Sequence, residues 1–170
     1  MKILIAVDGS AYTRAAARYI AHHLGRFAGP VEVHVLHVRA PVPYPFEASA
    51  AGKNAVDDYQ REESLKALGV AEKELAKAGI EFQSSWRVGD VAAEIETHSC
   101  ANHIDLIVTG CHGHGAPANL ALGSVATQLL ATATVPVLVV TREAASKADR
   151  EQRKSRGNGA QQGHAVTSNG

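Results

Sequence analysis

Short apolar runs alternate along this chain with segments in which apolar residues recur every three to four positions. The runs have the length and composition of buried strands and cover residues 2–7, 31–38, 80–88, 105–109 and 137–140. The segments between them have the periodicity of amphipathic helices and cover residues 11–28, 54–78, 91–102 and 124–132. Strands that alternate with helices in this way predict a parallel α/β sheet with right-handed crossovers.

The ends of these segments carry residues that begin and end helices. Ser10 is a good N-cap for the first helix, and Asp90 is a cap for the third. Gly79 has the position of a glycine that ends the second helix. Prolines at every second position of residues 41–45 exclude a helix or a central strand there. Apolar and polar residues alternate over residues 80–88, which predicts a half-exposed strand near a sheet edge.

Composition places the folded domain in the first 142 residues. Of the 170 residues, 45% are hydrophobic and only 5% are aromatic, so the core must consist of Val, Ile, Leu and Ala. That composition suits a parallel sheet covered by alanine-rich helices. In residues 143–170, Val166 is the one large apolar side chain, and we expect this segment to be a disordered basic tail.

Charge and cysteine content indicate which kinds of partner and which cellular location to expect. The chain has 17 basic and 17 acidic residues, but the last 25 residues carry a net charge of +3 and the body carries −3. An acidic body gives no support for nucleic-acid binding by the folded part. Cys100 and Cys111 match no metal or redox motif, which favours a reducing, cytoplasmic location. No apolar stretch approaches the ~20 residues that span a bilayer, so we expect no membrane contact.

A glycine-rich loop follows the run at residues 105–109 and reads GCHGHGAPANLALGS over residues 110–124. It is not a P-loop, because Ala116 and Pro117 stand where the phosphate-binding Lys and the hydroxyl residue belong. It fits the letters of a dinucleotide fingerprint from Gly113 onward. However, it follows the fourth strand and has no acidic residue about twenty positions later. Neither motif accounts for the loop.

The spacing G-x2-G-x9-G-S formed by Gly110, Gly113, Gly123 and Ser124 resembles the nucleotide-binding signature of the universal stress protein family. The resemblance extends in the right order over residues 1–141, through the segments 2–10, 34–38, 88–90, 105–110 and 136–140. It implies an open, doubly wound, Rossmann-like sheet of five parallel strands in the order 3-2-1-4-5, with helices on both faces.

The resemblance also implies an ATP site at the switch point between the first and fourth strands. It places the adenine beside Ala6, Asp8 and Val38. It places the sugar beside Thr109 and Gly110, and the phosphates beside Gly113, Gly123, Ser124 and Val125. The chemistry is consistent, because glycines admit close backbone approach and positive φ, and a helix start attracts anions.

Two positions depart from common family choices. His114 stands where a Lys or Arg often lies near the phosphates, and Ala126 replaces a frequent Ser or Thr. Either change would weaken the affinity for a triphosphate or shift the preference toward a less charged nucleotide.

Simpler interpretations of the same residues stay open. The glycine loop alone is also compatible with a structural turn, and Asp8 with a helix cap shared with Ser10. His112 and His114 lack a third ligand nearby in the sequence, so we assign no metal site. Cys111 is expected to be an inert thiol.

The resemblance implies an ATP-binding universal stress protein, a small cytoplasmic stress-response regulator. Its nucleotide state, with or without Mg²⁺, would tune its conformation or its binding of an unknown protein partner. The alternatives are a slow ATPase or autophosphorylating enzyme, and an interaction module that binds no nucleotide. We assign no catalytic residue, since the loop lacks a P-loop Lys, a catalytic base and a carboxylate pair. The apolar strand Val137–Val140 ends the implied sheet, which predicts a homodimer through antiparallel pairing of this edge.

Overall fold

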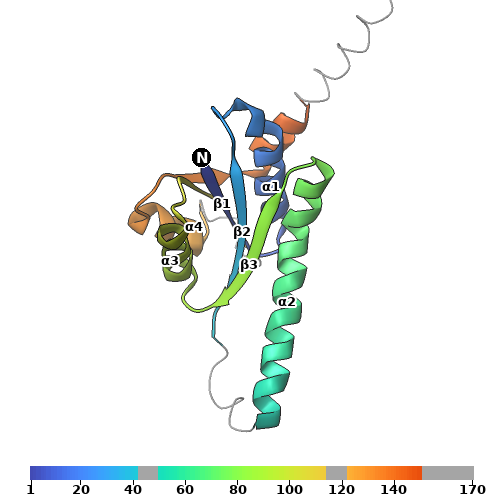
Figure 1. Cartoon of the computed structure of the whole chain (residues 1–170), viewed down its shortest axis with the longest axis vertical. Coiled ribbons are helices and arrows are strands. Elements are labelled where there is room, and N and C mark those ends of the chain that lie inside the picture. Colours follow the sequence, from blue (N-terminus) through green and yellow to red (C-terminus); the bar gives the residue numbers. More distant parts are fainter. Residues whose placement is uncertain (42–49, 114–121, 151–170) are drawn as a thin grey trace, which may run out of the picture.

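The computed structural model describes residues 1–41, 50–113 and 122–150. Five parallel strands form one sheet in the order β3-β2-β1-β4-β5 (Figure 1). They are β1 (Lys2–Val7), β2 (Glu32–Arg39), β3 (Phe82–Val88), β4 (Leu106–Gly110) and β5 (Val137–Val140). The predicted fold class and strand order are confirmed, and β3 lies at an edge as its alternating pattern predicted.

Helices cover both faces of the sheet, with α1 and α2 on one side and α3 and α4 on the other (Figure 1). They are α1 (Ala11–His23), α2 (Ala50–Lys77), α3 (Val91–Asn102) and α4 (Ser124–Thr132). The first helix ends earlier than predicted, because the chain tightens into the 3₁₀ turn η1 (Leu24–Arg26). The second begins four residues earlier than predicted. None of the helices in the described ranges is both long and apolar enough to cross a membrane.

The central strand β1 is buried on both faces, which explains its continuous apolar sequence. Ile3 and Ile5 point into the core shared with α1 and α2. Leu4 and Ala6 point into the second core, where they meet α3 and α4. This double burial fixes β1 at the centre of the sheet, with its carboxyl end between the two helical layers.

The predicted helix ends are confirmed where the structure describes them. The Ser10 Oγ accepts hydrogen bonds from the backbone N–H groups of two residues in the first turn of α1. The Asp90 Oδ1 accepts the N–H of Ala93 at 3.0 Å in α3. Gly79 has a φ of +70°, the left-handed conformation that favours glycine after a helix.

The predicted tail starts too early, because residues 142–150 are helical. Ala145 and Ala148 on this segment are each only 5% exposed, and Ala145 joins the core on the α1 side of the sheet. Asp149 lies 3.7 Å from an Arg18 nitrogen and 3.3 Å from His22 Nδ1. Small alanines pack here without any large apolar side chain, which is why composition did not reveal the segment. The rest of the predicted tail, residues 151–170, lies outside the described residues.

Candidate functional site

A pocket of about 330 Å³ opens where the sheet changes its direction of winding. The chain leaves β1 toward α1 on one face and leaves β4 toward α4 on the other. Because β1 and β4 are hydrogen-bonded neighbours, their carboxyl ends diverge at this point. Open α/β sheets bind ligands in the crevice at such a switch point.

The structure brings all the sequence-predicted site residues together. The pocket lining includes Ala6, Asp8, Val38, Thr109, Gly110, Gly113, Gly123, Ser124 and Val125. Ala126, which the sequence marked as a departure from the family, also lines it and is 2% exposed. His114, the other departure, lies outside the described residues. Contact of these residues with a nucleotide stays a prediction.

Sequence reasoning missed part of the lining, namely Val7, Thr13, Leu36, Val91, Ile95 and His112. Two signals were available for some of them. Leu36 lies two positions before Val38 and therefore on the same face of β2. Val91 and Ile95 are four positions apart and therefore on one face of α3. Thr13 carried no sequence signal beyond its place in the first turn of a helix.

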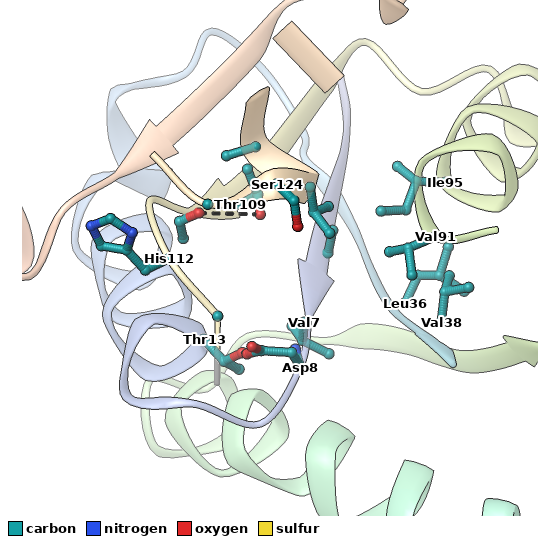
Figure 2. A pocket seen from close by; sticks show the side chains of 16 residues that line it. Val7, Asp8, Thr13, Leu36, Val38, Val91, Ile95, Thr109, His112 and Ser124 are labelled. Carbon is teal, nitrogen blue, oxygen red and sulfur yellow. Dashed lines mark hydrogen bonds between the residues drawn. The ribbon is translucent and has the colours of Figure 1, made fainter. Parts of the chain in front are cut away.

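One wall of the pocket is apolar. Leu36 and Val38 from β2 face Val91 and Ile95 from α3, and the four side chains gather on one side of the cavity (Figure 2). Ligand pockets combine such apolar surface with a few polar groups that fix orientation. This wall is suited to a flat, apolar ligand surface such as a nucleobase.

The start of α1 borders the pocket, but a side chain of the same turn already accepts hydrogen bonds from its backbone N–H groups. Ser10 Oγ accepts the N–H groups of Tyr12 at 3.1 Å and Thr13 at 3.3 Å. The Ser10 N–H in turn donates to Asp8 Oδ1 at 2.9 Å. The predicted helix-capping interpretation of Asp8 is therefore correct in part, although Asp8 also lines the pocket. An anion finds fewer unpaired donors at this helix start than at an uncapped one.

The start of α4, in contrast, has no side-chain cap. Its N-cap is Gly123, and no side chain caps it with a hydrogen bond. Ser124 places its hydroxyl in the pocket at the first turn (Figure 2). A helix start with unpaired N–H groups carries a partial positive charge and attracts anions. Both α1 and α3 begin at the pocket with a side-chain cap, from Ser10 and Asp90, so the uncapped start of α4 is the best anion site of the three.

Close approach, rather than positive φ, characterises the three signature glycines, and the contact is tightest at Gly110. None of them is among the glycines with positive φ. A Cβ on Gly110 would lie 2.5 Å from Tyr12 Cβ, and one on Gly113 would lie 2.7 Å from Asp8 Oδ2. At Gly123 the nearest atom would be His112 Cα, at 3.3 Å. The glycines let the loop pass beside α1 while the pocket stays open.

Charge is sparse at this site. Asp8 is the one Asp, Glu, Lys or Arg among the described residues that line the pocket. The described ranges contain no group of three or more His, Cys, Asp or Glu that could hold a metal. His112 packs its ring edge-on against Tyr12 with 5.2 Å between centroids. Burial raises the pKa of the Cys111 thiol, which agrees with an inert cysteine.

The family model for universal stress proteins matches residues 1–141. This chain belongs to the universal stress protein family. It is 30% identical over 137 residues to a universal stress protein of Synechocystis, and the match covers 81% of this chain and 41% of that protein. A universal stress protein of Bacillus subtilis is 31% identical over 147 residues, with coverage of 82% and 97%. The chain thus spans less than half of the first relative and nearly all of the second.

Solved structures of universal stress proteins share this fold. One from Lactobacillus plantarum has a TM-score of 0.67 at 22% identity, covering 82% of this chain and 97% of that one. A family member from Arabidopsis thaliana with AMP bound has a TM-score of 0.60 at 18% identity, covering 84% and 92%. One from Archaeoglobus fulgidus in complex with dAMP has a TM-score of 0.54 at 21% identity, covering 82% and 97%.

Proposed function

We propose that this universal stress protein binds ATP or a related adenine nucleotide in the pocket at the carboxyl ends of β1 and β4. The observation that carries the proposal is the pairing of an apolar wall with the uncapped start of α4 in one cavity. A nucleotide has the same two parts, a flat base and an anionic phosphate group. The AMP bound to the Arabidopsis thaliana family member and the dAMP bound to that of Archaeoglobus fulgidus support this choice of ligand.

The chemistry of the lining suggests how the ligand lies. The adenine packs between Val38 and the α3 side of the pocket, near Ala6. The sugar lies beside Thr109 and Gly110. The phosphates lie at Gly113, Gly123, Ser124 and Val125, where the loop backbone and the α4 start supply N–H donors.

Mg²⁺ fits this site only as a companion of the phosphates. Asp8, the one carboxylate of the described lining, is assigned to the nucleoside, and the described residues offer no set of three metal ligands. Because Mg²⁺ keeps several of its waters and binds substrate phosphates, such an ion would arrive with the nucleotide. When bound, the ion would neutralise phosphate charge.

We further propose that the bound nucleotide regulates the protein rather than serving as a substrate for rapid turnover. Among the described lining residues there is no Lys, no Arg and no second carboxylate beside Asp8. Phosphoryl transfer depends on such groups to neutralise and position the reacting phosphate. Occupancy of the pocket would instead tune the conformation of the protein or its binding of a protein partner.

A homodimer through β5 is part of the same proposal. This strand ends the sheet, and Val137, Leu138 and Val139 are each only partly buried in the single chain. An apolar edge strand favours pairing with a second copy.

Both cysteines are unpaired, which supports a reducing compartment such as the cytoplasm as the location.

The ligand can be identified on the purified full chain by native mass spectrometry and by chromatography of the acid extract. We expect an adenine nucleotide to be retained or to be taken up when supplied. Incubation with ATP for hours, with phosphate release followed against a blank, then separates a binder from an enzyme. Failure to take up any adenine nucleotide would contradict the proposal, and phosphate release at several turnovers per minute would contradict the regulatory part.

A further inference from the structure

Thr13 is the third residue of α1, lines the pocket and is 2% exposed. A buried hydroxyl in a helix usually donates to the carbonyl four residues earlier. Three other helical threonines do so here, and Thr97, Thr127 and Thr132 donate to the carbonyls of Ala93, Gly123 and Gln128. Thr13 behaves differently.

The hydroxyl of Thr13 is turned toward the end of β1. Its Oγ1 accepts the backbone N–H of Asp8 at 3.0 Å and that of Gly9 at 3.1 Å. Because two N–H groups approach the oxygen, its own proton goes to Asp8 Oδ1, at 2.8 Å. The hydroxyl thus uses its donor and both of its acceptor positions on the turn between β1 and α1.

These bonds fix one oxygen of the Asp8 carboxylate. Oδ1 receives the Thr13 hydroxyl and the Ser10 N–H, so rotation of the carboxylate would break two hydrogen bonds. The other oxygen, Oδ2, is the atom that a Cβ on Gly113 would meet at 2.7 Å. Asp8 and Thr13 lie together at the edge of the cavity, below the α4 start and opposite the apolar wall (Figure 2).

We infer that Thr13 is a positioning residue for this pocket. Its hydroxyl holds the Asp8 carboxylate beside Gly113, where the carboxylate accepts hydrogen bonds from donors of the nucleoside. The inference rests on the proposed function, since it names the residue that prepares Asp8 for the ligand. Preorganised groups bind more tightly because the ligand does not have to order them.

A purely structural role makes a different prediction. If Thr13 only satisfied the N–H groups of Asp8 and Gly9, its loss would lower stability and leave nucleotide affinity unchanged. The effect on affinity would also be independent of Asp8. A double-mutant cycle between the two side chains separates these cases.

The experiment measures adenine-nucleotide affinity by calorimetry on the full chain and on four variants, with thermal unfolding of each. The variants are Thr13→Val, which keeps the shape, Thr13→Ser, which keeps the hydroxyl, Asp8→Asn, and the double variant Thr13→Val/Asp8→Asn. We expect Thr13→Val to weaken binding about tenfold, the size of one hydrogen bond to a charged group. We expect Thr13→Ser to stay within about twofold of the parent, and the double variant to bind no more weakly than Asp8→Asn alone.

Each other outcome overturns the inference. Thr13 would have only a structural role if Thr13→Val bound the nucleotide as tightly as the parent does. The same would follow if the affinity losses of the two single variants multiplied in the double variant. If Thr13→Val does not fold, Thr13→Ala replaces it, and the nucleotide affinity of Thr13→Ala is compared with that of Thr13→Ser. Equal affinities of these two variants would then overturn the inference. If the parent protein itself binds no adenine nucleotide, the proposed function fails as well, which distinguishes that failure from the failure of Thr13 alone.

Discussion

Gly110 illustrates how a single missing side chain shapes the site. A Cβ at this position would lie 2.5 Å from Tyr12 Cβ and 3.2 Å from the Tyr12 carbonyl carbon. Neither atom is the end of a flexible side chain, so the loop and the start of α1 would have to separate. The Tyr12 ring also meets His112 edge-on, with 5.2 Å between the ring centroids. Close packing at Gly110 therefore holds the end of β4 against the start of α1.

Gly110→Ala should lower the free energy of unfolding by about 1–3 kcal/mol, the usual range for overpacking. Gly25→Ala is the matched control, because a Cβ there meets no atom within 4 Å. Urea denaturation of both variants measures the difference. Equal stability of the two variants would show that the contact with Tyr12 is relaxed without cost.

At the scale of single residues, the sequence predicted those site residues that residue type and spacing mark. The glycines and Ser124 were recognisable because their spacing matches the signature of the family. Thr13 was not, since its role depends on a hydroxyl orientation that only the folded turn decides. His114 and the neighbouring loop residues lie outside the described part of the chain, so their predicted effect on affinity stays a prediction.

At the scale of elements, α3 packs a histidine into the sheet. His98 is 7% exposed, and neither ring nitrogen has a hydrogen-bond partner among the described residues. Its ring meets His34 of β2 with 5.6 Å between centroids. Burial lowers the pKa of the His98 imidazole, and the charges of Arg87 and His34 act in the same direction. The folded state therefore favours neutral His98.

This predicts a loss of stability in acid. Above the ordinary histidine pKa of about 6.5, His98 is neutral in both the folded and the unfolded state, so it adds no pH dependence to the free energy of unfolding. As the pH falls through that value, the unfolded state binds a proton that the folded state resists, so stability decreases until the pH drops below the folded-state pKa. Denaturation at pH 7.5 and pH 5.5 should show a larger loss for the parent than for His98→Leu. An equal loss in both proteins would contradict this account.

Elements were predictable where periodicity is strong. The five strands were located within two residues at each end, because the inner strands are continuously apolar and the edge strand β3 alternates between apolar and polar residues. The segment 142–150 was missed, since its buried apolar residues are the small Ala145 and Ala148 and it carries no large apolar side chain. The strand order came from the family resemblance, because alternating strands and helices are compatible with several orders.

At the scale of the whole molecule, the outer edge of β5, which pairs with no further strand among the described residues, supports the proposed dimer. The carbonyls of Pro136 and Val140 accept N–H groups from β4 and its loop, each at 3.0 Å. Residues alternate along a strand, so the backbone groups of Val139 face away from β4. This geometry leaves them directed toward a second copy.

Val139→Pro should produce a monomer, because proline removes an outward N–H and leaves the ladder with β4 intact. Val139→Thr keeps the N–H and the branched side chain, and should stay dimeric. Size-exclusion chromatography with light scattering measures the mass of both variants. A dimer of Val139→Pro, or a monomeric parent protein, would contradict pairing through this edge.

The most direct test of the central claim is an ATP titration of the parent protein, Gly123→Val and Gly69→Ala by isothermal calorimetry. A side chain at Gly123 enters the space between His112, Gly113 and the start of α4, whereas one at Gly69 meets no atom within 4 Å. We predict that the parent and Gly69→Ala bind ATP with equal affinity, and that Gly123→Val binds at least about tenfold more weakly while unfolding at a similar temperature. Equal binding by Gly123→Val, or no binding by the parent, would contradict the nucleotide site.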